Sequence, residues 1–149
     1  MLYKTKGVDP MDISISSTIE NVDWTRMKEI YHSVGWRKHD EEKIKKIFNV
    51  SNVITIAYDG DKIVGFGRAI SDGIFNAAIY DVVIEDIYQN KGIGQQIISN
   101  LLIQLKDISC VHLVATTGNE EFYRKVGFSK MKTGMARYLN PILTDEYLE

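Results

Sequence analysis

Residues 88–97, YQNKGIGQQI, form a polar turn that contains two glycines and leads directly into an apolar-periodic segment. Gly92 and Gly94 stand where a helix is expected to begin. A helix start exposes unpaired backbone N–H groups at the positive end of the helix dipole, and glycine lets a ligand approach that backbone closely. The turn therefore predicts an anion site, with phosphate as the leading candidate.

The turn does not match the two common nucleotide-binding motifs. A dinucleotide fingerprint needs G-x-G-x-x-G, but the residues after Gly92-Ile93-Gly94 are QQI, so the third glycine is missing. The P-loop pattern G-x-x-x-x-G-K-[ST] does not occur in the chain. The phosphate must therefore belong to another kind of ligand.

Polar side chains in two strand-like segments are the next candidates. Asp81 follows Tyr80 within the apolar segment YDVVIED, which indicates a role in a site or in a hydrogen-bond network. Strand alternation predicts that these two side chains lie on opposite faces, so that only one can face a substrate. Arg68 and Asp72, in GFGRAISDG, could bind a substrate or pair with each other across a hairpin.

The histidines and the cysteine give no sign of a metal site or a nucleophile. His32, His39 and His112 lack metal-ligand spacing, so we expect solvated or core residues and no metal. Cys110 is the only cysteine, which excludes an intrachain disulfide, and its apolar surroundings predict a buried thiol.

The composition is that of one globular domain spanning residues 1–149. The 18 basic and 20 acidic residues give a net charge of -2, which offers no basic surplus for nucleic acid. No apolar run is long enough for a signal peptide or a membrane span. We therefore expect a cytoplasmic protein without nucleic-acid or membrane partners.

Periodicity predicts an α+β domain with three layers around one mixed sheet. The helix near the N-terminus, capped by Asn21 or Asp23, has an apolar stripe that includes Tyr31. The predicted helices cover residues 21–34, 41–48, 92–105 and 119–126, and the predicted strands cover 12–19, 52–58, 61–70, 75–85, 110–116 and 135–140.

Several of these segments together resemble the GCN5-related N-acetyltransferase (GNAT) superfamily. Residues 89–94, QNKGIG, match [QR]-x-x-G-x-[GA] after the strand YDVVIED, and NEEFYRKVGF downstream resembles the element FY-x-x-x-GF. The resemblance is close over residues 50–130. It implies a three-layer α/β/α fold with a mostly antiparallel sheet, and acetyl-CoA as co-substrate with no metal.

The resemblance also implies the cofactor contacts. The backbone of Val82, Val83 and Ile84 would pair with the pantetheine arm in a gap between two splayed strands, with the Val82 N–H near the acetyl carbonyl. The pyrophosphate would lie on the backbone of the turn, which comprises Gln89, Asn90, Lys91, Gly92, Ile93, Gly94 and Gln95, with Lys91 as a charge partner on the solvent side.

The resemblance places the acid that protonates the leaving thiolate at Tyr123, beside Phe122. Asn119 precedes Tyr123 by fewer residues than the asparagine of the commoner family pattern N-x-x-A-x-x-x-Y. Two roles therefore stay open for Asn119: binding the pantetheine or capping its own helix. Asp81 or a water chain would serve as the base.

The acceptor candidates are Trp36, Arg68, Asp72 and Tyr80. Trp36 would stack on the acceptor or staple two helices together. The implied reaction is acetyl transfer to a primary amine, favouring a small molecule, within a ternary complex. The alternative is a CoA-binding regulatory module of the same fold without turnover. The resemblance also allows a homodimer.

Overall fold

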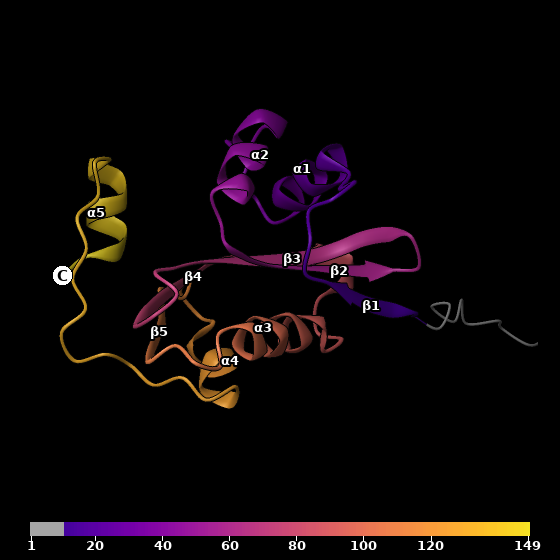
Figure 1. Cartoon of the computed structure of the whole chain (residues 1–149). Helices are drawn as coiled ribbons and strands as arrows, with labels where there is room; N and C mark the ends of the chain where they lie inside the picture. Colours follow the sequence, from indigo (N-terminus) through magenta and orange to yellow (C-terminus); the bar gives the residue numbers. More distant parts are fainter. Residues whose placement is uncertain (1–10) are drawn as a thin grey trace, which may run out of the picture. The chain divides into compact units, whose positions relative to one another are not determined.

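The computed structural model describes residues 11–149. These residues fall into two compact units, one that ends at Thr116 and one formed by Thr117–Glu149. The first unit contains a single sheet in the order β1-β2-β3-β4-β5 (Figure 1). Its strands are β1 (Ile13–Ser16), β2 (Val53–Asp59), β3 (Lys62–Ser71), β4 (Asn76–Ile84) and β5 (Cys110–Leu113).

Pairing within the sheet is antiparallel from β1 to β4 and parallel between β4 and β5. Short turns join β2 to β3 and β3 to β4, and a helix must join β4 to β5 because parallel neighbours need a crossover. The predicted mixed, mostly antiparallel sheet is confirmed. In the part of the chain that the structure describes, no helix has the length and apolar content that a membrane crossing requires.

Helices cover both faces of the sheet (Figure 1). Helices α1 (Trp24–Ser33) and α2 (Glu41–Asn49) pack on one face, and α3 (Ile93–Gln104) packs on the other. Of the two predicted caps for α1 it is Asp23 that serves, its side chain accepting a hydrogen bond from the Arg26 N–H at 3.0 Å. The three-layer α/β/α prediction is confirmed.

The packing of α3 against β3 depends on two glycines. A Cβ atom at Gly67 would lie 3.0 Å from side-chain carbons of both Ile97 and Leu101, and one at Gly65 would lie 3.0 Å from the Val83 carbonyl oxygen. Glycine at these positions therefore lets the helix approach the strand closely. This contact fixes α3, and with it the helix start beside the end of β4.

The second unit differs from the prediction. It contains α4 (Glu120–Lys125) and α5 (Pro141–Tyr147), and the strand predicted for residues 135–140 is wrong. Asn140 caps α5 by accepting a hydrogen bond from the Ile142 N–H at 3.0 Å, and Pro141 occupies the first turn. The Asn-Pro pair thus starts a helix directly after the segment that was predicted to be a strand.

Cys110 is exposed, so the prediction of a buried thiol is also wrong. It is the first residue of β5, an edge strand among the described residues, and its backbone N–H donates to the Phe75 carbonyl at 2.8 Å. The apolar residues next to Cys110 in the sequence therefore do not determine whether Cys110 is buried.

Candidate active site

Strand β4 loses its parallel partner half-way along its length. Strand β5 pairs only with Asn76–Ile79, whereas β3 continues to pair with β4 as far as Ile84. Among residues 11–116, no strand pairs with residues 80–84 on the β5 side. This open edge, as we call residues 80–84, leaves room for another extended chain to run beside β4.

A β-bulge interrupts β4 at the start of the open edge. Arg68 pairs with Tyr80 and Phe66 pairs with Val83, so Asp81 and Val82 both stand opposite one residue of β3. Asp81 has a φ of 50°, which is unusual for a residue with a side chain. The bulge changes the direction in which the following side chains point.

The bulge brings Tyr80 and Asp81 to the same arginine. The Arg68 Nε donates to Asp81 Oδ2 at 2.8 Å, and the guanidinium carbon lies 5.0 Å from the centre of the Tyr80 ring. The prediction that Tyr80 and Asp81 lie on opposite faces is therefore wrong, because strict alternation does not hold across a bulge. A second hydrogen bond from Arg68 Nη1 reaches Ser51 Oγ at 3.2 Å.

Asp81 also accepts a hydrogen bond from a residue of helix α1. The buried Tyr31 hydroxyl donates to Asp81 Oδ2 at 2.9 Å. Burial, and then the charge of Asp81, raises the pKa of Tyr31, so the phenol keeps its proton and remains a donor. Both contacts of the carboxylate fall on Oδ2. The other oxygen, Oδ1, has no hydrogen bond to a described residue.

His39 completes this group from the α1–α2 connection. Its ring stacks on Tyr31 with 4.3 Å between ring centres and 12° between planes. Within residues 11–149, its Nδ1 is a buried atom without a hydrogen-bond partner, and burial lowers its pKa. We call Tyr31, His39, Arg68, Tyr80 and Asp81 the Asp81 cluster. The sequence analysis missed the involvement of Tyr31 and His39.

Trp36 and Asp72, two of the acceptor candidates, have different surroundings. Trp36 is half-buried against Tyr31, with 5.8 Å between ring centres, so it packs beside the cluster. Asp72 does not pair with Arg68. Its Oδ1 accepts the backbone N–H groups of the turn after β3, at 2.8 Å from Ile74 and 2.7 Å from Phe75, and such bonds lower its pKa. Asp72 therefore organises the β3–β4 turn.

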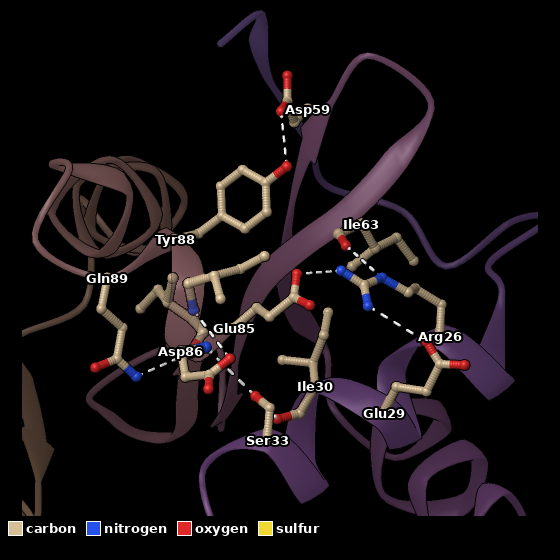
Figure 2. A network of polar contacts seen from close by, with 12 residues as sticks. Arg26, Glu29, Ile30, Ser33, Asp59, Ile63, Glu85, Asp86, Tyr88 and Gln89 are labelled. Carbon is tan, nitrogen blue, oxygen red and sulfur yellow. Dashed lines mark hydrogen bonds and ion pairs between the residues drawn. The ribbon is translucent and has the colours of Figure 1, made fainter. Parts of the chain in front are cut away.

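The loop that leaves the open edge is held by side chains from α1 and β2 (Figure 2). We call residues 85–92 the β4–α3 loop; it includes the short helix η1 (Asp86–Tyr88). Arg26 forms an ion pair with Glu85 and donates through Nε to the Ile63 carbonyl at 2.9 Å. Further along the loop, the Tyr88 hydroxyl donates to Asp59 Oδ2 at 2.9 Å.

The loop ends in the glycine turn. Gly92 is the N-cap of α3 with a φ of 82°, and no atom lies within 4 Å of the place where a Cβ would stand. The first hydrogen bond of the helix runs from Gln96 N to Gly92 O at 3.2 Å, so the N–H groups of the three preceding residues point out of the helix start. No acidic residue occupies this first turn. The turn therefore fits an anion.

The polar side chains of the turn leave its backbone open. The Gln89 amide donates back to the Ile84 carbonyl at 3.1 Å, and Lys91 Nζ lies 5.5 Å from the centre of the Tyr88 ring. A surface cavity of about 420 Å³ touches Gly92 and Gln95, but the rest of its lining belongs to α3 and to Ile15 of β1 rather than to β4. Across residues 11–149, no group of three or more potential ligands could hold a metal ion.

The predicted acid lies in the second unit. Tyr123 belongs to α4, and its ring lies 5.0 Å from that of Phe122 and 6.0 Å from that of Phe128, between ring centres. Burial raises the pKa of Tyr123, so its phenol is protonated at neutral pH. Asn119 occupies the N-cap position of α4. The roles of Asn119, Phe122 and Tyr123 at a cofactor stay predictions.

The open edge, the glycine turn and the three layers agree with what is known of one family. The family profile described as "Acetyltransferase (GNAT) domain" matches residues 51–130. The chain belongs to the GNAT acetyltransferase family. The predicted superfamily is confirmed.

Named relatives of this GNAT domain include proteins with and without a stated acceptor. The chain is 38% identical to the "uncharacterized N-acetyltransferase ycf52" of Pyropia yezoensis, over 83% of this chain and 74% of that protein. It is 31% identical to "serotonin N-acetyltransferase 2, chloroplastic" of Oryza sativa subsp. japonica, over 69% of this chain and 54% of that protein.

A solved GNAT family acetyltransferase from Streptococcus pneumoniae TIGR4 has a similar structure. Its TM-score is 0.74 with 29% sequence identity, and the match covers 87% of this chain and 98% of that chain. The fold and the family are thus supported by sequence and by structure.

Proposed function

We propose that this protein transfers the acetyl group of acetyl-CoA to a primary amine of a small molecule, by direct transfer in a ternary complex. The observation that carries the proposal is the open edge of β4, which runs past the Asp81 cluster and continues into the glycine turn. An extended chain that carries a phosphate group matches this arrangement in chemistry.

In this proposal the pantetheine arm lies along the backbone of Val82, Val83 and Ile84. The pyrophosphate lies on the helix start and accepts hydrogen bonds from backbone N–H groups of residues 90–95, because the Gln89 N–H already donates to the Asp86 carbonyl at 3.3 Å. Gly92 supports this placement because the space beside it is empty. Asn119 and Phe122 are proposed to contact the co-substrate as well, as the family resemblance implies.

The transfer step forms a C–N bond and breaks a C–S bond. The nitrogen of the neutral amine attacks the thioester carbonyl, and the Val82 N–H donates to the oxyanion that develops. Collapse of the tetrahedral intermediate releases the thiolate, which takes its proton from the Tyr123 hydroxyl. The amine loses one proton to a base, and solvent exchange restores Tyr123.

Asp81 is the proposed base. Arg68 and Tyr31 hold its Oδ2, which fixes the orientation of the carboxylate and leaves Oδ1 to accept the amine proton. A water molecule between Oδ1 and the amine would serve the same end.

The acceptor cleft is proposed to lie around Tyr80 and Trp36. Tyr80 is 46% exposed at the start of the open edge, and Trp36 is half-buried beside Tyr31. Exposed aromatic rings favour an acceptor with an apolar or aromatic body attached to its amine. The name of the rice relative supports including arylalkylamines among the acceptors to be tested.

The test is a thiol-release assay with acetyl-CoA and a panel of polyamines, arylalkylamines, aminoglycosides, amino acids and peptides. Release that depends on a small-molecule amine supports the proposal, and release only with peptides would overturn the proposed acceptor class. Thermal stabilisation by acetyl-CoA without turnover of any amine would favour the CoA-binding regulatory module.

A further inference from the structure

Arg26 connects three parts of the structure at the start of the β4–α3 loop (Figure 2). It lies in the first turn of α1, pairs with Glu85 of the loop, and donates to the Ile63 carbonyl of β3 at 2.9 Å. The Arg26 and Glu85 side chains are only 12% and 13% exposed. Their contact is thus a largely buried ion pair between a helix and a loop.

The same helix makes another contact with the loop. The Asp86 backbone N–H lies 3.4 Å from the hydroxyl oxygen of Ser33, which is the last residue of α1. The Glu85 backbone N–H donates to the Val64 carbonyl at 2.9 Å. The loop start is therefore held by β3 and α1, on the stretch of chain where β5 no longer pairs with β4.

The location of the Arg26–Glu85 ion pair indicates whether it serves stability or geometry. A buried ion pair contributes little net stability, because removing two charges from water offsets most of their attraction. Such a pair does fix geometry, since each charge strongly favours one partner and one orientation. Glu85 directly follows β4 and begins the loop that leads to Gly92, so its orientation determines where the backbone N–H groups of the turn lie.

We propose that Arg26 is a positioning residue for the co-substrate: its ion pair with Glu85 holds the β4–α3 loop in the geometry that binds acetyl-CoA. Helix α1 thereby sets the affinity for the pyrophosphate end. The inference rests on the proposed function, because it takes the loop to be the pyrophosphate site.

The experiment compares Arg26→Met with the wild type and with a matched control, Lys28→Met. Lys28 lies on the same helix and pairs with Glu41 at 3.1 Å, away from the loop and with both side chains more exposed. Each protein is titrated with acetyl-CoA by calorimetry and assayed with acetyl-CoA and with S-acetylpantetheine, which lacks the pyrophosphate.

For Arg26→Met we expect the Kd and the KM for acetyl-CoA to rise by about tenfold with kcat changed by less than about twofold. The kcat/KM for S-acetylpantetheine is expected to stay within about twofold of wild type, because that substrate makes no contact with the loop. Lys28→Met should match the wild type in both assays. A general loss of structure would instead lower activity with both substrates.

Two results would overturn the inference: Arg26→Met that binds acetyl-CoA as tightly as the wild type, or equal losses with the two substrates. If Arg26→Met does not fold, Glu85→Gln provides the same comparison, since it removes the charge that pairs with Arg26 and keeps a side chain of nearly the same size. A wild type that binds no acetyl-CoA would refute the proposed function itself, which is a different outcome.

Discussion

Arg68 and Asp81 form an ion pair between neighbouring strands, with 2.8 Å between Nε and Oδ2, in surroundings where their side chains are 12% and 13% exposed. The pair exists because the bulge in β4 turns Asp81 toward Arg68 and toward the Tyr31 hydroxyl of α1. One carboxylate oxygen is thus fixed by protein and the other is left to a ligand. This division of the two oxygens suits a group that must hold a fixed position and still accept a proton.

Asp81→Asn is expected to reduce both activity and stability. The amide cannot take the amine proton, so kcat should fall by about 100-fold, a common effect of removing a general base. The Arg68 charge is left without its counter-charge, which should lower the free energy of unfolding by about 2 kcal/mol. Steady-state kinetics and urea unfolding measure the two effects.

The double variant Arg68→Met/Asp81→Asn is the control for this prediction. It removes both charges, so part of the lost stability should return while activity stays low. Full activity in Asp81→Asn would show that Asp81 is not the base and would leave a water chain in that role.

His39 should make the folded protein sensitive to mild acid. Burial lowers its pKa, so the folded chain binds this proton less tightly than the unfolded chain does. The free energy of unfolding should therefore fall as the pH drops below about 6.5, the ordinary value for histidine. His39→Phe keeps a ring on Tyr31 and removes the titration, so its urea midpoint should change less than that of the wild type between about pH 7.5 and about pH 5.5. Equal changes in both proteins would contradict the assignment.

Gly92 offers a test of the anion site with closely matched variants. Gly92→Asp and Gly92→Asn have side chains of nearly the same size, and asparagine tolerates the left-handed backbone that the φ of 82° requires. Both variants should fold, but the carboxylate repels the pyrophosphate. We expect Gly92→Asp to bind acetyl-CoA at least about tenfold more weakly than Gly92→Asn, a difference of about 1.4 kcal/mol. Equal affinities by calorimetry would show that no anion binds at this turn.

Tyr123→Phe should separate catalysis from binding. Loss of the phenol proton should lower kcat by about 100-fold while the Kd for acetyl-CoA stays close to that of the wild type. Tyr138→Phe is the control, since Tyr138 lies in the same unit and contacts Tyr147. If Tyr123→Phe keeps the wild-type kcat, the proton for the leaving thiolate comes from another donor.

Local signals in the sequence predicted most of the fold. The turn glycines, the Asp23 cap and the apolar stripe of α3 each depend on residues close together in the chain, and the structure has all of them. The family motif added the open edge and the glycine turn. The turns, the cap, the helix stripe and the motif were predictable because each consists of residues at a fixed spacing in the chain.

The Asp81 cluster could not be predicted in the same way. It joins residues 31, 39, 68, 80 and 81, which come from four elements, and its geometry depends on a bulge that leaves no pattern in the sequence. Tyr31 was read only as part of an apolar stripe, because helical spacing reports which residues are buried and not what a buried hydroxyl binds. The prediction of a strand at residues 135–140 was wrong for a local reason, because Asn140 and Pro141 start a helix.

The open edge of β4 also has a consequence for handling the protein. Unpaired main-chain groups on a strand can accept a β-strand from a neighbouring molecule as readily as a slender ligand, and such strand addition is a common route to aggregation. In the proposed function, the pantetheine arm of acetyl-CoA occupies this edge. Adding CoA during purification should therefore keep the protein monodisperse at concentrations where the ligand-free protein precipitates.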